Sequence, residues 1–137
     1  MPNFNPIFTR TPRSAWATLT AANIAKDGTG TTSLIATADA VEGAMLLDIT
    51  CEPIGTNVVS VLRVFQNNGS IPATAANNTL IGQIALPATT LSETTTATMQ
   101  AVLRTFNRPL PPGHRIYVCL ATAVAAGWQI TASSGDY

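Results

Sequence analysis

Few residues in this sequence could carry acid–base or nucleophilic chemistry. His114 is the single histidine, and it follows Pro111, Pro112 and Gly113 at the start of an apolar run. A Ser-His-Asp arrangement would have to combine His114 with Asp48 or Asp136 and a serine, but the strand-to-helix nucleophile motif that would present such a serine is missing. We therefore expect a surface or capping histidine, no catalytic residue and a protein that is not an enzyme.

The residues that could bind a metal or a cofactor are equally sparse. Cys51 and Cys119 lie far apart in apolar segments, and with one histidine they do not make a zinc ligand set. We expect both to be buried free thiols. The DGTG segment at 27–30 lacks the alternating acids of a calcium loop and the lysine of a phosphate loop, so it is interpreted as a plain turn. We expect no metal and no cofactor.

Charge is the most unusual feature of the composition. Charged residues make up 10% of the 137-residue chain, the formal net charge is zero and Lys26 is the only lysine, whereas about 25% is typical of soluble domains. The composition favours a surface that partner proteins cover. No basic stripe predicts nucleic-acid binding, and no apolar run predicts a membrane span. The first residues lack a signal-peptide pattern, so we expect synthesis in a reducing cytoplasm.

The first 14 residues are predicted to form an extended arm. Pro2, Pro6 and Pro12 prevent a regular helix there. The apolar side chains of Phe4, Ile7 and Phe8 cannot form a core of their own in so short a segment. The arm is either an unattached tail or a segment that buries these side chains on a neighbouring molecule.

From residue 15 onward, strand-like segments alternate with turn signals. We predict strands at 14–25, 33–38, 43–52, 56–66, 79–86, 96–106, 114–124 and 127–137. No segment has a sustained helical period. Alternation in the third strand is expected to place Met45, Leu47, Ile49 and Cys51 on one face. In the fourth strand it is expected to group Val58, Ser60, Leu62 and Val64.

Eight strands in about 120 residues predict an all-β, antiparallel sandwich as a single domain, residues 15–137, behind the arm at 1–14. The long connections at 67–78 and 87–95 suit crossings between two sheets, so a jelly roll is preferred. An immunoglobulin-like sandwich is the alternative, although Cys51 and Cys119 have the wrong spacing for its disulfide. Trp16 and Trp128 lie in the first and last strands, where they could form a sugar platform, but we expect them to pack in a core or on a shared sheet face.

The second half of the chain carries a resemblance. The segments GTNVVSVLRVFQNNGS, TAANNTLIGQIALPATTLSET and LPPGHRIYVCLATAVAAGWQITASSGDY, within residues 55–137, resemble small structural proteins of tailed bacteriophages. The resemblance implies a virion component made in the host cytoplasm. Its most direct reading is a capsid decoration (cement) protein, a jelly roll that assembles as a homotrimer on the outside of the head and binds the major capsid protein.

Under this hypothesis the arm binds the capsid or an adjacent protomer through five side chains: Phe4, Ile7, Phe8, Arg10 and Arg13. The alternative is a tail-tip or fibre head domain that recognises a receptor or glycan through loops 67–78 and 107–113. A hydrolase is the third and least supported possibility, and it would depend on His114.

Overall fold

The computed structural model describes residues 9–95 and 102–137, and these form eight β-strands and one short 3₁₀ helix. The strands are β1 (Thr11–Leu19), β2 (Ser33–Thr37), β3 (Ala44–Pro53), β4 (Ser60–Asn67), β5 (Asn78–Leu86), β6 (Val102–Leu110), β7 (Arg115–Leu120) and β8 (Trp128–Asp136), and the 3₁₀ helix η1 is Ala75–Asn77. The prediction of eight strands is confirmed. Residues 96–101, predicted as the start of the sixth strand, lie outside the described residues.

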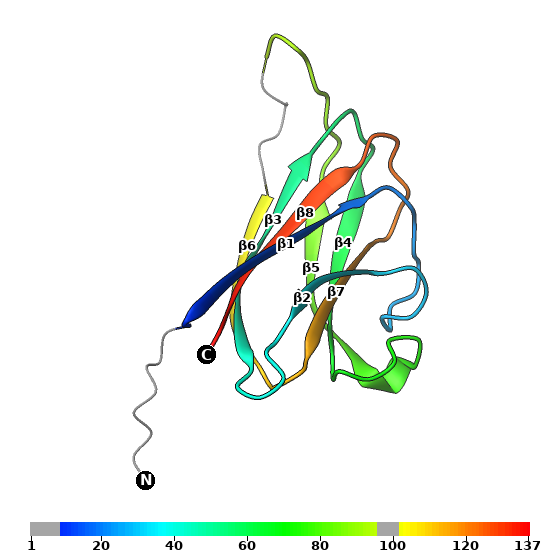
Figure 1. Cartoon of the computed structure of the whole chain (residues 1–137). Coiled ribbons are helices and arrows are strands. Elements are labelled where there is room, and N and C mark those ends of the chain that lie inside the picture. The colour runs from blue at the N-terminus through cyan, green and yellow to red at the C-terminus, as the bar shows by residue number, and fades with distance from the viewer. Residues whose placement is uncertain (1–8, 96–101) are drawn as a thin grey trace.

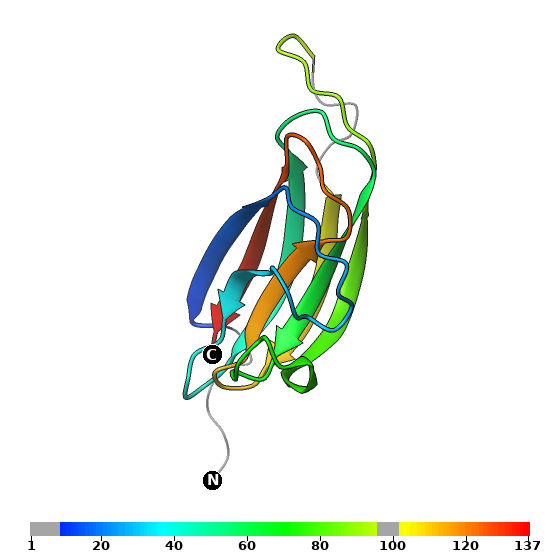
Figure 2. The same cartoon turned by 90° about the vertical axis from the view of Figure 1, so that its right-hand side faces the viewer.

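The strands form two four-stranded antiparallel sheets packed face to face (Figures 1 and 2). The first sheet has the order β1-β8-β3-β6 and the second the order β2-β7-β4-β5. First pairs with last, second with seventh, third with sixth and fourth with fifth. This nested pairing is jelly-roll topology, in which one long antiparallel hairpin of four strand pairs folds over into two sheets. The preference for a jelly roll over an immunoglobulin-like sandwich is therefore correct.

The core fills the space between the two sheets. Strand alternation sends every second side chain inward, and the largest of these are wholly buried. The fully buried set includes Leu46, Ile49, Leu62, Leu86, Ile116, Ile130 and Trp128. The predicted inward face of the fourth strand is confirmed for Ser60, Leu62 and Val64, whereas Val58 precedes β4 and is exposed.

A β-bulge in β3 changes the predicted face of that strand. The register of β3 with both neighbours shifts between Leu46 and Asp48. Leu46 is therefore buried, while Met45 and Leu47 are only half-buried; Ile49 and Cys51 return to the core beyond the shift. The prediction that Met45 and Leu47 share a face with Ile49 and Cys51 is wrong, because one extra residue inverts the alternation.

The second sheet is also covered on its outer face. Phe65 and Cys119 point away from the inter-sheet core, yet Phe65 is 0% exposed and Cys119 2%. The β1–β2 connection crosses this face. Asn23 N–H donates to Leu120 O at 2.7 Å, and Asn78 Nδ2 at the start of β5 donates to Asp27 O at 3.2 Å. The DGTG turn thus belongs to a connection that covers part of this outer face.

Two predicted boundaries differ in the structure. Strand β1 begins at Thr11, so the last part of the predicted arm belongs to the sandwich. The predicted breaker at 107–113 contributes its first part to β6, which continues to Leu110. Both Pro12 and Pro109 are accommodated because β1 and β6 are edge strands, where a missing N–H need not break a ladder. Among the described residues, no helix is long and apolar enough to cross a membrane.

Candidate partner-binding surfaces

The described arm residues are held against the body of the sandwich. Arg13 Nε pairs with the Asp136 carboxylate, and Arg10 Nη2 pairs with Glu42 and donates to Tyr137 O at 3.3 Å. The arginine side chains nevertheless remain 55% and 52% exposed for Arg10 and Arg13 respectively. Arg13 thus joins β1 to the end of β8, Arg10 joins the residue before β1 to the β2–β3 turn and to Tyr137, and both leave surface for a partner. Phe4, Ile7 and Phe8 lie outside the described residues.

A tight turn positions the acid that meets Arg10. Asp39 Oδ1 accepts hydrogen bonds from the backbone N–H groups of Val41 and Glu42, both at 2.8 Å. These N–H donors, that of Glu42 first, hold the pKa of Asp39 below its ordinary value. The turn between β2 and β3 therefore stays closed with Glu42 facing Arg10.

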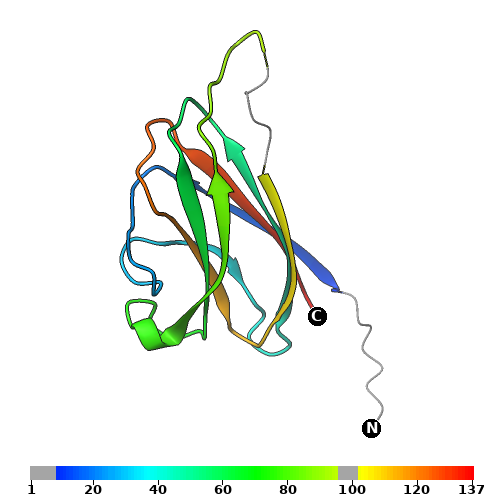
Figure 3. The same ribbon diagram turned by 180° about the vertical axis from the view of Figure 1, so that it is seen from behind.

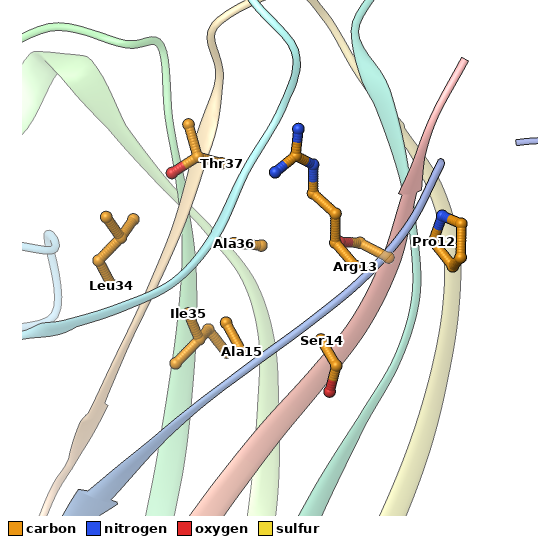
Figure 4. A pocket seen from close by; sticks show the side chains of 9 residues that line it. Pro12, Arg13, Ser14, Ala15, Leu34, Ile35, Ala36 and Thr37 are labelled. Carbon is orange, nitrogen blue, oxygen red and sulfur yellow. The ribbon is translucent and has the colours of Figure 1, made fainter. Parts of the chain in front are cut away.

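The sandwich is open on the side where β1 and β2 form the sheet edges. We call this opening the β1–β2 groove; its volume is about 480 Å³, and it is lined by Pro12, Arg13, Ser14, Ala15, Leu34, Ile35, Ala36, Thr37 and Ser134 (Figure 4). Ala15 faces the interior, because it is paired with Ala132, which is 1% exposed, yet Ala15 itself is exposed. The side chains here are too short to close the gap between the sheets.

On the opposite side of the sandwich, β5 and β6 form the edges of the two sheets (Figure 3). Arg104 lies over the Phe106 ring at 5.0 Å from its centroid, and its Nη1 donates to Gln83 O at 2.9 Å. Phe106 packs against the core from the same edge. A long cation and an aromatic ring therefore fill one opening of the sandwich, whereas alanines leave the other as a groove.

The outer face of the first sheet carries mostly hydroxyl side chains around one tryptophan. Its register sets Trp16 beside Thr131 and Thr131 beside Thr50. The neighbouring rows are Ser14, Ser133, Asp48 and Thr105, and Thr18, Gln129 and Glu52. We call these three rows the β1–β8–β3 face. It carries two carboxylates, and its short hydroxyl side chains surround one large aromatic ring.

The two tryptophans occupy different environments, contrary to the expectation that they share a core or a face. Trp16 is 64% exposed on the β1–β8–β3 face, whereas Trp128 is 0% exposed in the core. The strands do pair, but the register places Trp16 opposite Thr131 and Trp128 opposite Leu19. An odd separation along the paired strands puts the rings on opposite faces. Trp128 consequently cannot contribute to a sugar platform.

A second hollow, of about 230 Å³, lies beside the 67–78 loop. Gln66 connects two basic side chains there: its Oε1 accepts from Arg108 Nε at 2.6 Å, and its Nε2 lies 2.9 Å from His114 Nδ1. Asn68, Asn77 and Asn78 line the same hollow. The loop's asparagines mainly hold its own backbone, as when Asn67 Oδ1 accepts from Gly69 N–H at 2.8 Å. His114 is therefore part of a polar network under this loop.

The groups considered for chemistry are engaged in structural contacts. Asp136 pairs with Arg13, and His114 with Gln66, so this acid and this base do not form a catalytic pair. Cys51 and Cys119 are buried free thiols, as predicted. Burial raises the pKa of Cys51 to about 12 and also raises that of Cys119. No group of three or more potential metal ligands gathers within the part of the chain that the structure describes.

Comparisons with known proteins give little beyond this geometry. No protein-family model matches the chain, and no curated protein matches it. Among solved structures, a chain in "Structure of infectious bursal disease virus Gx strain" is similar at 11% identity and a TM-score of 0.31, over 97% of this chain and 36% of that chain. This chain thus spans about a third of that chain's length. A likeness this distant carries no functional argument, and the jelly-roll assignment depends on strand order alone.

Sequence reasoning did not find the β1–β2 groove. Its signal is present, because Ala15 and Ala36 are small residues at inner positions of the first and second strands, where larger side chains would close a sandwich. The signal could not be interpreted without knowing that these strands both lie at sheet edges on the same side.

Proposed function

We propose that this protein is a non-enzymatic structural component of a tailed-phage virion, and specifically a decoration protein on the outside of the head. The observation that carries the proposal is the β1–β8–β3 face. Protein interfaces are depleted in charge at their centre and enriched in tryptophan. Trp16, 64% exposed amid Thr and Ser, matches that composition on a sheet supported by a full core.

The jelly-roll architecture and the resemblance of residues 55–137 to small phage structural proteins agree with this reading. A decoration protein acts by mass action, because it binds the assembled shell more strongly than its separated subunits and so opposes disassembly. Many copies on one particle make the effect large even when each contact is weak. The Trp16 row, with Thr131 and Thr50, carries no charge, which limits the desolvation cost at the centre of such a contact.

The first test is immunogold electron microscopy on intact particles, with an antibody against the purified protein. Gold over the head supports the decoration role. Gold confined to the tail tip, or absent from intact particles, contradicts it. A second measurement compares the temperature at which purified heads release their DNA with and without added protein. A decoration protein raises that temperature.

One observation favours tail-tip recognition as a second candidate. The hollow beside the 67–78 loop presents amide, imidazole and guanidinium groups, which suit hydrogen bonding to the hydroxyl groups of a glycan. A saturable signal on a glycan array that is lost in Asn77→Ala would support this candidate. Trp16→Ala serves as the control, because the structure places Trp16 in the β1–β8–β3 face and outside this hollow.

A further inference from the structure

We propose that residues 1–8 of one copy bind in the β1–β2 groove of a second copy, as an extended strand added to the free edge of β1. The inference deepens the proposed function, because it names the groove through which copies of the protein join. It is tested on purified protein, so its failure is separable from failure of the decoration role.

The groove has the backbone features that strand addition requires. Among the residues that the structure describes, β1 pairs only with β8 and β2 only with β7, so each leaves one edge without a partner strand. Strand β1 is nine residues long and exposed along most of its length. Long exposed edges are templates for another strand unless charge, a bulge or a covering segment blocks them. Pro12 and the half-exposed Arg13 interrupt this edge only near its start.

The groove also requires apolar side chains to fill it. The buried residues that line it are Ile35 at 1% exposure and Ala36 at 6%. The methyl group of Ala15 is too short to cover them from the β1 side. On the opposite side of the sandwich, the equivalent opening is occupied by Phe106 beneath Arg104. A large apolar side chain that inserts beside Ala15 would complete the β1–β2 side in the same way, and Arg13 could lie over an inserted aromatic ring.

The sequence MPNFNPIF has the alternation of such a strand. In an extended conformation residues 2, 4, 6 and 8 lie on one face, and these are Pro, Phe, Pro and Phe. The other face carries Asn3, Asn5 and Ile7. One face is thus apolar throughout, which suits the groove, and the other is largely polar, which suits solvent.

The prolines follow the same alternation. Backbone N–H groups of even residues point to one edge of a strand and those of odd residues to the other. Pro2 and Pro6 are both even, so the missing N–H groups lie on one edge. The odd edge, with Asn3, Asn5 and Ile7, retains every N–H for pairing with β1.

Length and direction favour a second copy over the same chain. Eight extended residues reach about 26 Å, close to the roughly 30 Å of nine-residue β1. Arg10 N–H donates to Asp136 O at 2.7 Å, so the chain still runs alongside the end of β8 one residue before β1 begins. To enter its own groove the segment would have to reverse directly before that bond, and the turn would consume residues needed for pairing.

The first experiment measures the mass of the purified full chain by sedimentation equilibrium. We expect the wild type to be a multiple of 14.3 kDa, and the double variant F4N/F8N to shift to the monomer. The matched control is Ile7→Asn, a large apolar residue changed to the same amide on the outward face, which should keep the wild-type mass. A monomeric wild type, or equal loss in Ile7→Asn, would overturn the proposal. Circular dichroism confirms that each variant keeps the sandwich.

The second experiment locates the segment. A photo-crosslinking phenylalanine analogue replaces Phe4, and ¹⁴N-labelled and ¹⁵N-labelled copies are mixed before irradiation. Mass spectrometry should find mixed-isotope crosslinks from position 4 to peptides containing 12–15 or 34–37. Crosslinks confined to one isotope, or directed to other surfaces, would exclude exchange between copies. If the segment instead binds purified heads as a monomer, the decoration role stands and this inference fails.

Discussion

At the scale of single residues, buried amide side chains connect the loops of this protein through hydrogen bonds. Asn57 is 3% exposed and binds three connections at once. Its Oδ1 accepts from Gly127 N–H at 2.8 Å and Ala126 N–H at 3.1 Å, and its Nδ2 donates to Gly127 O at 2.8 Å. Its backbone exchanges hydrogen bonds with Thr89. One residue thus joins three loops: its side chain joins the loop before β4 to the loop before β8, and its backbone joins it to the loop after β5.

Asn57→Ala should therefore destabilise the fold strongly. It removes the acceptor of the buried Gly127 N–H and of the Ala126 N–H, while Gly127 O keeps the hydrogen bond from Ile54 N–H at 3.2 Å. The change should cost roughly 1–3 kcal/mol. The control is Asn68→Ala, because Asn68 is exposed and hydrogen-bonds only within its own loop, to Asn77 and Ser70. That change should cost less than about 1 kcal/mol. Urea unfolding measures both, and similar losses would contradict the assignment.

Burial of the Cys51 thiol predicts a pH dependence. Its pKa is raised from 9.0 to about 12 in the folded state, so unfolding above pH 9 releases a proton. The free energy of unfolding should then fall by up to about 1.4 kcal/mol per pH unit from this thiol between pH 9 and 12. Cys51→Ala removes the effect. The measured quantity is the difference in unfolding free energy between wild type and variant from pH 8 to 10.5, and a constant difference would contradict the prediction.

At the scale of elements, the strands were predictable and their irregularities were not. Period-two alternation and turn residues located eight strands. The prediction that the connection at 67–78 crosses between the sheets is wrong, because it joins β4 to β5, which pair within one sheet. The connection that follows β5 does lead to β6 in the other sheet. The bulge at Leu47 escaped prediction, because an extra residue has meaning only against the paired strands β8 and β6. The buried outer position of Phe65 escaped for a similar reason, since it depends on a distant segment crossing the sheet. The β1–β2 groove required the strand order as well as the alternation.

The same register shift gives a test at this scale, because it leaves residues 106 and 107 of β6 unpaired opposite the bulge in β3. Asn107 has φ of 44°, the one positive value at a non-glycine position among the described residues, and it lies where the β3–β6 register shifts. Asn107→Val places a β-branched side chain in the left-handed region and should cost about 1–3 kcal/mol. Asn107→Gly, which tolerates this φ, should cost less than about 1 kcal/mol. Thermal unfolding compares them, and equal losses would show that the bulge rearranges.

At the scale of the whole molecule, the two sheets have different outer surfaces. The β1–β2 connection covers the outer face of the second sheet, where Phe65 and Cys119 are buried. The β1–β8–β3 face of the first sheet stays open and carries Trp16. The molecule thus has one partly covered face, one open face and one open edge. Under the proposed function, the open face would bind the shell, and the β1–β2 groove would join neighbouring copies.

This division predicts that Trp16 and Phe4 affect different measurements. Trp16→Ala should leave the melting temperature nearly unchanged, because the ring is 64% exposed. It should weaken binding to purified heads about 30-fold per site. That factor corresponds to the loss of about 2 kcal/mol that is typical of a tryptophan hot spot. Its oligomeric mass should stay that of the wild type. The control is Ile24→Ala, an apolar residue that is 82% exposed on the β1–β2 connection, which should bind heads normally. Co-sedimentation with purified heads measures the binding. Unchanged binding by Trp16→Ala would exclude the β1–β8–β3 face as the contact surface. Lost binding with an unchanged oligomeric mass would support separate surfaces for head binding and for self-association.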